Sequence, residues 1–480
     1  MMKEQIVERY PMIESFHNGV NQELDEQIIS INEATIAENC SIEDGNLSLC
    51  KGYVKFNEIN LPIGDKKLMK FYKNNEATIL IATNNAIYKL NDSGTAYEII
   101  SSGYDNNNFN FVNYQIDLDE VTVLTNGVDN VKVYDGTTFR DLKNDGRDST
   151  DGINNKSPKG KFVELHKERL WISGDSEHPN RLYFSKDFDI DDWTYPVDDL
   201  EANQHGGFID IPTWDGGIVI GMKSLFDDVV VFKNKNVFRI FGTYPGNYNV
   251  LQVFNTIEGK ILNNTIASVE NTAIWTSTEG IHIFNGVNTS LISNKIKRYF
   301  DEINMNYIDK AVAVIHDRKY LLAVPTGSST ENNIIIEYDM KKNSFVIKRG
   351  INVTSFLSIG DDLLFTNSNG NIFKYGVGNT FDGNPIHSVW ETGIIHFDEQ
   401  NARKILNRIY FKASGTGRIK ITCYSERKTV SKEIELTSDM TFYRHRMRNK
   451  GRHMKFRFEN IGGCDFTIKQ PQFMIDFDYD

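Results

Sequence analysis

The sequence predicts an all-β protein, and three observations support this prediction. Aromatic residues make up 12% of the 480 residues, with 30 Phe and 21 Tyr, and aromatic side chains favour strands. Asparagine is frequent and there are 35 Gly, and both residue types serve tight turns. The apolar stretches are short and are separated by these turn residues, which is the pattern of strands joined by turns.

Composition and charge limit the class of protein further. Hydrophobic residues make up 40% of the chain, which is enough for a large core and excludes a disordered or collagen-like chain. The longest apolar runs, such as Val229–Phe232, are far shorter than the ~18 residues that span a bilayer. The first ten residues are charged and contain no apolar segment, so we expect no secretion signal. The formal net charge is −12.

The four cysteines, Cys40, Cys50, Cys423 and Cys464, match no zinc or redox spacing. Four thiols are too few to hold a chain of this length together by disulfides, so we expect folding in a reducing cytoplasm. A bridge between Cys40 and Cys50 stays open as an alternative.

A strand–turn–strand unit recurs along the chain. The copies are Ile79–Thr83 with Ala86–Leu90, Val121–Leu124 with Val131–Tyr134, Arg169–Ser173 with Arg181–Phe184, Val229–Lys233 with Val237–Gly242, Ala273–Thr276 with Gly280–Phe284, Tyr320–Val324 with Asn333–Tyr338, and Leu363–Thr366 with Asn371–Tyr375. Most copies begin about 40–50 residues after the preceding one, a period typical of β-propellers. We therefore predict a six- or seven-bladed β-propeller over residues 47–384. A pair of sandwiches or an irregular all-β fold is the alternative.

Other segments complete the predicted organisation. The strand-like piece Leu47–Phe56 is expected to complete the last blade, against the strands near 364–375, and residues 1–46 to form an N-terminal arm. Apolar spacing predicts a helix over Ser293–Ile303. After residue 384 the rhythm changes, and six alternating strands predict a C-terminal β-sandwich over residues 385–480. These strands are Ile405–Ala413, Arg418–Tyr424, Lys432–Leu436, Thr441–Met447, Met454–Asn460 and Asp465–Phe477.

Signatures of catalysis are missing from the sequence. There is no G-x-S-x-G elbow, no phosphate-binding loop, no H-E-x-x-H and no dinucleotide fingerprint. The ten histidines form no pair at metal-ligand spacing with a carboxylate partner. We therefore expect no enzyme activity, no cofactor and no resident metal.

The best acidic cluster contains Asp187, Asp189 and Asp191, which are spaced like the ligands at positions 1, 3 and 5 of a calcium-binding loop. Asp192 stands where such a loop needs a glycine. The stretch also resembles the Asp-box of sialidase-type propellers, a structural turn, although its glycine is missing and Trp193 comes one position late. We interpret the segment as a turn with Trp193 packed beneath it, and weak cation binding is the alternative.

The stretch from Arg444 to Arg457 contains seven Lys and Arg and no acidic residue, so the rest of the chain is more acidic than the net charge indicates. We interpret it as two strands joined by a turn near 449–451. Alternation on a strand places Arg444, Arg446 and Arg448 on one face, and we select these residues with Lys450 and Arg452 as a contact with another subunit or partner. A solvated or salt-bridged face and a phosphate contact are the alternatives.

Several segments together carry a resemblance to a known family: Phe16–Asn21, Gly45–Gly52, Arg169–Asp175, Pro179–Ser185, Phe232-Lys233 with Val237–Gly242, and the basic stretch Arg446–Arg452. They resemble virion β-propeller proteins of bacteriophages, the group that contains tail nozzle and packaged-DNA stabilisation proteins of short-tailed phages. Asn18 and Lys51 depart from the residues usual in the group. The resemblance implies a ring, often a hexamer, that lies below the portal and adaptor and surrounds a channel for DNA.

Three functions remain to be weighed. The first is a structural virion protein of a phage tail, assembled in the host cytoplasm, which forms a nozzle or plug and retains or releases the genome. DNA would pass through without sequence-specific binding, since an acidic wall repels phosphate. The second is a receptor- or carbohydrate-binding propeller with exposed aromatics such as Trp214, Tyr244 and Tyr248 on one rim. The third is a glycosidase-like enzyme with paired carboxylates.

Overall fold

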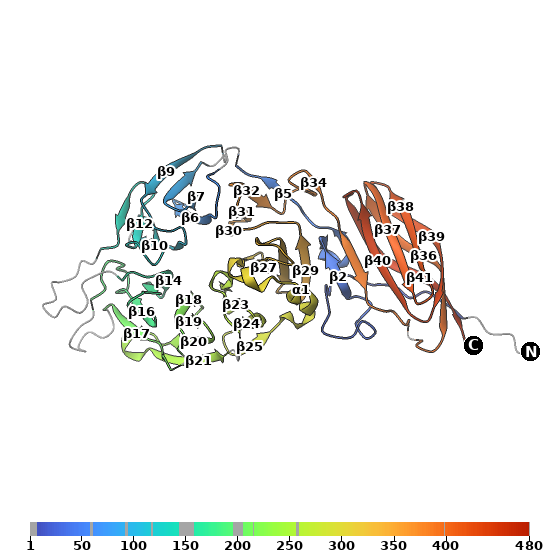
Figure 1. Cartoon of the computed structure of the whole chain (residues 1–480), viewed down its shortest axis with the longest axis horizontal. Coiled ribbons are helices and arrows are strands. Elements are labelled where there is room, and N and C mark those ends of the chain that lie inside the picture. Colours follow the sequence, from blue (N-terminus) through green and yellow to red (C-terminus); the bar gives the residue numbers. More distant parts are fainter. Residues whose placement is uncertain are drawn as a thin grey trace, which may run out of the picture.

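The computed structural model describes residues 7–57, 61–91, 95–116, 119–143, 158–194, 205–214, 216–255, 259–397 and 399–479. The regular elements of these residues are almost all strands, and they form a ring of sheets beside a pair of stacked sheets (Figure 1). Residues 1–6, on which the expectation of a missing secretion signal mainly rests, lie outside the described residues. Within these ranges, no helix is long and apolar enough to cross a bilayer.

The ring consists of antiparallel units of four strands, and the described residues form seven such units. The first five units are separate sheets. The first consists of β6 (Lys67–Lys73), β7 (Glu76–Ala82), β8 (Ala86–Leu90) and β9 (Tyr97–Ser102), and the second of β10 (Asn110–Ile116), β11 (Asp119–Thr125), β12 (Lys132–Tyr134) and β13 (Phe139–Asp141). The third consists of β14 (Phe162–His166), β15 (Arg169–Ser173), β16 (Arg181–Phe184) and β17 (Gly207–Asp210), the fourth of β18 (Val219–Ser224), β19 (Asp228–Lys233), β20 (Asn236–Phe241) and β21 (Asn249–Asn255), and the fifth of β22 (Ala267–Val269), β23 (Thr272–Ser277), β24 (Gly280–Phe284) and β25 (Thr289–Leu291).

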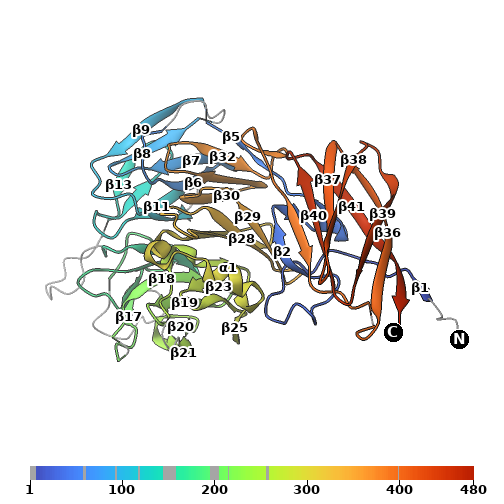
Figure 2. The same ribbon diagram turned by 45° about the vertical axis from the view of Figure 1, so that its right-hand side comes forward.

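The last two units belong to larger sheets. They are β26 (Val312–His316), β27 (Lys319–Val324), β28 (Ile334–Asp339) and β29 (Ser344–Arg349), and then β30 (Ser355–Ile359), β31 (Asp362–Thr366) and β32 (Ile372–Tyr375) with β5 (Tyr53–Lys55). The first strand of each unit contacts the first strand of the next, and β30 contacts β6, which closes the ring. This part of the chain is therefore a β-propeller (Figure 2).

The sequence located the middle strands of these units best. Strands β8, β15, β16 and β24 have the predicted limits. All five side chains of β15 and all six of β19 are buried, because neighbouring units cover both faces of a middle strand. Outer strands such as β9, whose side chains are partly exposed, carry no continuous apolar run, and the sequence did not predict them.

Closure of the seventh unit depends on a shorter piece of chain than expected. Only Tyr53–Lys55 pairs with β32, and Tyr53 lies opposite Tyr375. The preceding strand β4 (Leu47–Leu49) pairs instead with β41 (Phe466–Asp478) in the C-terminal region. Between them Gly52 lies so close to the Thr380 carbonyl that an added Cβ would stand 1.9 Å from it. Glycine thus lets the chain cross from the stacked sheets to the propeller.

The C-terminal region consists of two stacked sheets. One contains β36 (Arg403–Gly415), β39 (Thr441–Gly451) and β41, and the other contains β35 (Val389–Thr392), β37 (Gly417–Ser425), β38 (Thr429–Leu436) and β40 (Met454–Ile461). All six predicted strands are present. Phe456 of β40 packs on Phe473 of β41 with ring centroids 4.2 Å apart, so the apolar faces of the two sheets meet.

The N-terminal segment joins the propeller to these stacked sheets. Strand β2 (Ala34–Glu38) pairs in parallel with β29 at Ile347 and antiparallel with β35 at Trp390, which creates one nine-stranded sheet. Strands β1 (Val7–Arg9), β3 (Cys40–Ser41) and β4 extend the opposite sheet. Upstream of β2, Phe16 is completely buried and meets Trp390 edge-to-face at 5.3 Å. Residues expected to form a separate arm therefore contribute strands to both layers.

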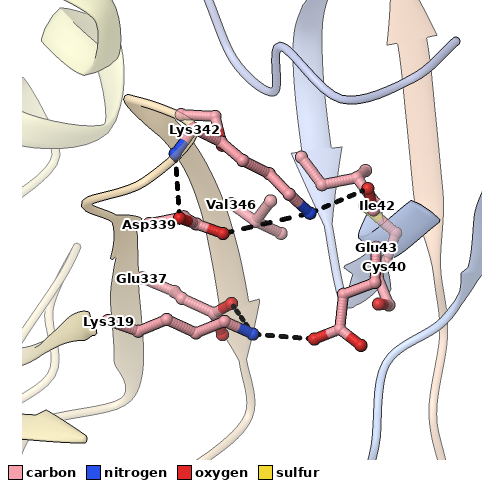
Figure 3. A pocket seen from close by; sticks show the side chains of 10 residues that line it. Cys40, Ile42, Glu43, Lys319, Glu337, Asp339, Lys342 and Val346 are labelled. Atoms are coloured by element: carbon pink, nitrogen blue, oxygen red, sulfur yellow. Dashed lines mark hydrogen bonds and ion pairs between the residues drawn. The ribbon is translucent and has the colours of Figure 1, made fainter. Parts of the chain in front are cut away.

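Charged side chains line a small pocket at this junction (Figure 3). The Lys319 Nζ lies 2.8 Å from the Glu43 carboxylate and 3.3 Å from that of Glu337. Burial alone would lower the pKa of Lys319, but Glu337 and Glu43 outweigh it and hold this pKa above its usual value. The buried Lys348 Nζ donates to the Cys40 carbonyl at 2.5 Å. All four cysteines are free thiols, so Cys40 and Cys50 form no bridge.

Helical structure is sparse. The predicted helix over 293–303 corresponds to the 3-10 turn η5 (Ser293–Ile296) and the one-turn helix α1 (Lys297–Asp301). The remaining short elements are η1 (Glu43–Gly45), η3 (Pro245–Asn247), η4 (Asn263–Thr265), η6 (Met305–Lys310), β33 (Thr380–Phe381) and β34 (Asn384–Pro385). Arg298 of α1 forms an ion pair with Glu26 at 3.1 Å, so α1 contacts the N-terminal segment.

Removal of the Phe16 ring tests how strongly the N-terminal segment stabilises the junction. We expect Phe16→Ala to lower the free energy of unfolding by about 3–5 kcal/mol, because a buried aromatic ring leaves a cavity. Phe226→Ala is the matched control, since Phe226 is 80% exposed and its loss should change stability by less than about 0.5 kcal/mol. Guanidinium denaturation measures both, and equal effects would contradict the prediction.

The lowered pKa values of two buried histidines predict how the free energy of unfolding depends on pH. Burial lowers the pKa of both His166 and His282 to about 4, whereas the unfolded chain takes up these protons near pH 6.5. The unfolded state therefore binds more protons at mildly acidic pH, and stability falls as the pH drops from 7.5 to 5.5. We expect a loss of about 1 kcal/mol for each histidine.

Denaturation across this pH range measures the loss. His282→Gln keeps a hydrogen-bonding group near Ser277, whose Oγ lies 2.9 Å from His282 Nε2, and it should reduce the slope by about half. A slope unchanged by this substitution would show that His282 is not a source of the pH dependence.

Candidate partner-binding face

Four of the five predicted contact residues, all except Arg452, lie on strand β39. Among the described strands, β39 ends one of the two stacked sheets and pairs only with β36. Its side chains alternate strictly over most of its length: Met447 and Asn449 are buried, whereas Arg444, Arg446 and Arg448 are exposed. The three arginines therefore share the outer face of the sheet, as the alternation predicted. Phe442 lies on the same face and is 60% exposed.

Strand β36 adds residues that the sequence interpretation did not select. Arg408 lies directly opposite Arg446, Tyr410 opposite Arg444, and Lys412 opposite Phe442. Arg408, Tyr410 and Lys412 alternate within the strand predicted over Ile405–Ala413, so their common face could have been read from the sequence. Their position beside β39 could not, because it depends on long-range pairing. We call the surface formed by Arg408, Tyr410, Lys412, Phe442, Arg444, Arg446 and Arg448 the arginine face.

The positive charge of the arginine face is not neutralised by any carboxylate that the structure describes. Over the part of the chain that the structure describes, no carboxylate forms an ion pair with any of its five cationic side chains. Arg408 and Arg446 are like charges in directly opposed positions, an arrangement that destabilises a sheet. Arg444 instead lies over the Tyr410 ring at 5.8 Å, and Tyr410 stacks on Phe442 at 6.0 Å. The surface therefore combines positive charge with the exposed Phe442 ring and the half-buried Tyr410 ring.

The rest of the basic stretch does not belong to this face. The two predicted strands are present as β39 and β40, but the turn predicted near 449–451 is wrong, because these residues still belong to β39. The two strands lie in different sheets and do not form a hairpin. Their buried side chains belong to opposite layers of one core, and the connection at 452–453 crosses between the layers. On β40, Lys455 lies 2.7 Å from the Glu391 carboxylate and Arg457 lies 3.1 Å from that of Glu459.

Two of the five selected residues stand apart from the three arginines. The Lys450 Nζ forms an ion pair of 2.6 Å with Asp478 on β41, so its charge is neutralised. Arg452 lies at the corner between the two sheets, where its backbone N–H donates to Glu426 at 2.6 Å. The structure therefore brings together Arg444, Arg446 and Arg448 and separates Arg452 from them.

The acidic cluster after β16 is held by arginines. Arg140 binds both oxygens of Asp191, at 2.9 and 2.8 Å, and Arg169 lies 3.5 Å from Asp187. Trp193 is buried in the core between the second and third units, which agrees with a turn that packs on its tryptophan. Across the described ranges, no group of three His, Cys, Asp or Glu side chains is arranged to hold a metal ion.

The aromatic residues expected on one rim do not gather there. Trp214 is 69% exposed and Tyr244 is 38% exposed, but Trp214 precedes β18 whereas Tyr244 follows β20. These two strands run in the same direction, since each pairs antiparallel with β19. The two residues therefore lie at opposite ends of the unit. The Tyr248 hydroxyl is buried, and its ring packs on Trp171 at 5.5 Å.

The fold defines this chain as a β-propeller protein with an appended pair of stacked sheets. Its sequence matches no family model and no curated protein. Solved structures that it resembles include the WD40 domain of Pan2 from Neurospora crassa, with 8% identity over 70% of this chain and 98% of that one and a TM-score of 0.42.

Two further solved structures are similar at the same level. BamB from Moraxella catarrhalis has 8% identity over 68% of this chain and 97% of its own, with a TM-score of 0.39. Virginiamycin B lyase from Staphylococcus aureus has 11% identity over 67% of this chain and 98% of its own, with a TM-score of 0.39.

Reversal of one charge on the arginine face tests whether the repulsion between Arg408 and Arg446 lowers the stability of the fold. We expect Arg446→Glu to raise the free energy of unfolding by about 0.5–1 kcal/mol, because a cross-strand attraction to Arg408 replaces a repulsion. Arg427→Glu, in the exposed turn between β37 and β38, is the control and should change stability by less than about 0.5 kcal/mol. Urea denaturation at low salt measures both, and destabilisation by Arg446→Glu would contradict the prediction.

Proposed function

We propose that this protein is a structural subunit of a bacteriophage tail, and that its arginine face docks on an acidic surface of a neighbouring subunit or adaptor. The observation that carries the proposal is the opposed pair of Arg408 and Arg446 on an exposed, aromatic-rich sheet face. A surface that costs stability in the isolated chain is best explained by a partner that neutralises it. The loose resemblance of the sequence to virion propellers supplies the biological setting.

Charge complementarity favours a second copy of the chain as one such partner. The whole chain has a net charge of −12, although the arginine face carries five uncompensated positive charges. Contact between this face and an acidic surface of the next copy is a head-to-tail interface, and such interfaces generate rings when the rotation closes. The proposed ring is a hexamer, in line with the virion proteins that the sequence resembles, and it contacts the portal or adaptor and other tail proteins.

The acidic remainder of the chain fits a channel for DNA. A wall of the same sign as the phosphate backbone lets DNA slide without adhering, so the proposed ring retains or releases the genome without sequence-specific binding. The arginine face would then lie away from the channel. The four free cysteines agree with assembly in the host cytoplasm before incorporation into the virion tail.

A receptor- or carbohydrate-binding propeller is the competing function. Its expected signature is a cluster of exposed aromatic rings on one rim, and Trp214 and Tyr244 lie at opposite ends of their unit instead. Glycan binding by the isolated protein would nevertheless favour this function over the tail subunit.

Charge reversal of the arginine face tests the proposal. Wild-type protein should form rings that are visible by negative-stain imaging, alone or with a portal–adaptor complex. The triple variant Arg444→Glu, Arg446→Glu, Arg448→Glu should stay folded by circular dichroism but lose ring formation, because the docking charge is inverted. The matched control is Lys235→Glu, Lys341→Glu, Arg427→Glu, which changes the net charge equally at exposed positions elsewhere.

Three outcomes would overturn parts of the proposal. Rings formed equally well by the triple variant would show that the arginine face is not the contact. Rings in which Arg446 lines the bore would assign this face to DNA instead. A wild-type protein that stays monomeric with the portal–adaptor complex would exclude the tail subunit.

A further inference from the structure

A cavity of about 230 Å³ lies at the centre of the propeller ring. Most of its wall comes from segments that precede the first strands of five units: residues 65–67 before and at the start of β6, 107–108 before β10, 264 before β22, 309–312 before and at the start of β26, and 353–354 before β30. Residues 331–332, in the loop between β27 and β28, complete it. Because first strands surround the axis and these five units are consecutive around the closed ring, the cavity is axial. It is independent of the arginine face.

Three lysines, Lys66, Lys67 and Lys310, line this cavity, and none of them forms an ion pair with a carboxylate among the described residues. Lys310 is exposed, whereas Lys66 is buried and Lys67 is half-buried. Lys66 is only 3% exposed, and within the described part of the chain its Nζ donates one hydrogen bond, of 2.6 Å, to the Gly64 carbonyl. An ammonium group has three donors, so two of them have no acceptor among the described residues. Lys67, at the start of β6, forms no side-chain hydrogen bond or ion pair with any residue that the structure describes. Burial lowers the pKa of Lys67 to about 8, and the charge of Lys223 across the axis adds to this effect.

The acidic residues of the cavity do not neutralise these lysines. Asp309, at the rim, is 74% exposed and forms an ion pair with Lys260 at 2.8 Å. Asp65 is exposed, and its attraction only partly offsets the burial that lowers the pKa of Lys66. The remaining acidic group, Glu331, belongs to the loop between β27 and β28, and forms no ion pair with a described residue. Asp65 and Asp309 are exposed, whereas Lys66 is buried and Lys67 is half-buried, so these two lysines lie deeper than the two aspartates.

The cavity wall is held in place by side-chain amides. The Asn332 Nδ2 donates to the carbonyls of Lys310 and Val353, both at 2.8 Å, and thereby ties together the sixth and seventh units. The Asn107 Nδ2 donates to the Asp65 carbonyl at 2.7 Å and links the second unit to the first. The lysines thus face a preformed space, which reduces the ordering cost of binding.

We propose that this axial cavity binds a small anion that carries a carboxylate or phosphate group, with Lys66 and Lys67 as its ligands. A buried ammonium without a counter-charge is costly, and an anion of this class removes the cost through charge-assisted hydrogen bonds. The preformed cavity of about 230 Å³ gives room for such a solute.

Isothermal titration calorimetry of the full chain at pH 7 tests the proposal, with inorganic phosphate and citrate as separate probes. At least one probe should bind, and Lys67→Met should weaken that binding at least tenfold while the side chain keeps a similar volume. Lys235→Met is the matched control, since Lys235 lies in an exposed turn of the propeller outside the cavity, and it should bind as wild type does. The two probes distinguish a phosphate site from a carboxylate site.

Thermal unfolding supplies a second readout that does not depend on calorimetric heat. A ligand that binds only the folded state raises its stability, so the binding anion should raise the melting temperature of wild type and of Lys235→Met but not of a folded Lys67→Met. The proposal fails if neither anion binds wild type, or if Lys67→Met binds as tightly as wild type.

Discussion

The pairing of β2 with two partners determines the arrangement of the whole molecule. Its parallel contact at Ile347 and its antiparallel contact with β35 make one sheet out of a propeller unit and a layer of the C-terminal region. Hydrogen bonds between backbones fix distance and direction more strictly than side-chain contacts do. The ion pairs of Lys319 and the buried Phe16 ring then stabilise a junction whose geometry is already set. The C-terminal sheets are therefore part of a rigid body with the propeller.

This rigidity gives the arginine face a fixed orientation relative to the propeller axis. A docking surface on a flexible linker would allow many relative orientations, and closed rings would compete with open chains. In the proposed ring, the angle between the propeller axes of neighbouring copies therefore depends on how β2 joins the propeller to the stacked sheets. The axial cavity lies in the propeller ring, whereas the arginine face lies on the stacked sheets, so an anion could occupy the cavity without contact with the arginine face.

The sequence predicted the features that depend on local pattern. Middle strands such as β15 were located to the residue because their apolar runs are bounded by turn residues, and alternation placed Arg444, Arg446 and Arg448 on one face. The assignment of β39 and β40 to different sheets was missed, because consecutive strands usually pair with each other. Arg408 and Lys67 were missed for a related reason: their importance comes from neighbours that are distant in the chain.

The closure of the ring by β5 has a consequence for synthesis of the chain. Tyr53 leaves the ribosome early, but its partner Tyr375 follows more than three hundred residues later. Strand β2 likewise can pair with β35 only after β35 has been synthesised, and β4 can pair with β41 only after the end of the chain has been synthesised. Contacts of such high sequence separation form slowly, and unpaired strand edges are prone to aggregation meanwhile. The N-terminal strands therefore remain without their final partners until most of the chain has been synthesised, which makes this protein a candidate substrate for chaperones that shield edges during synthesis.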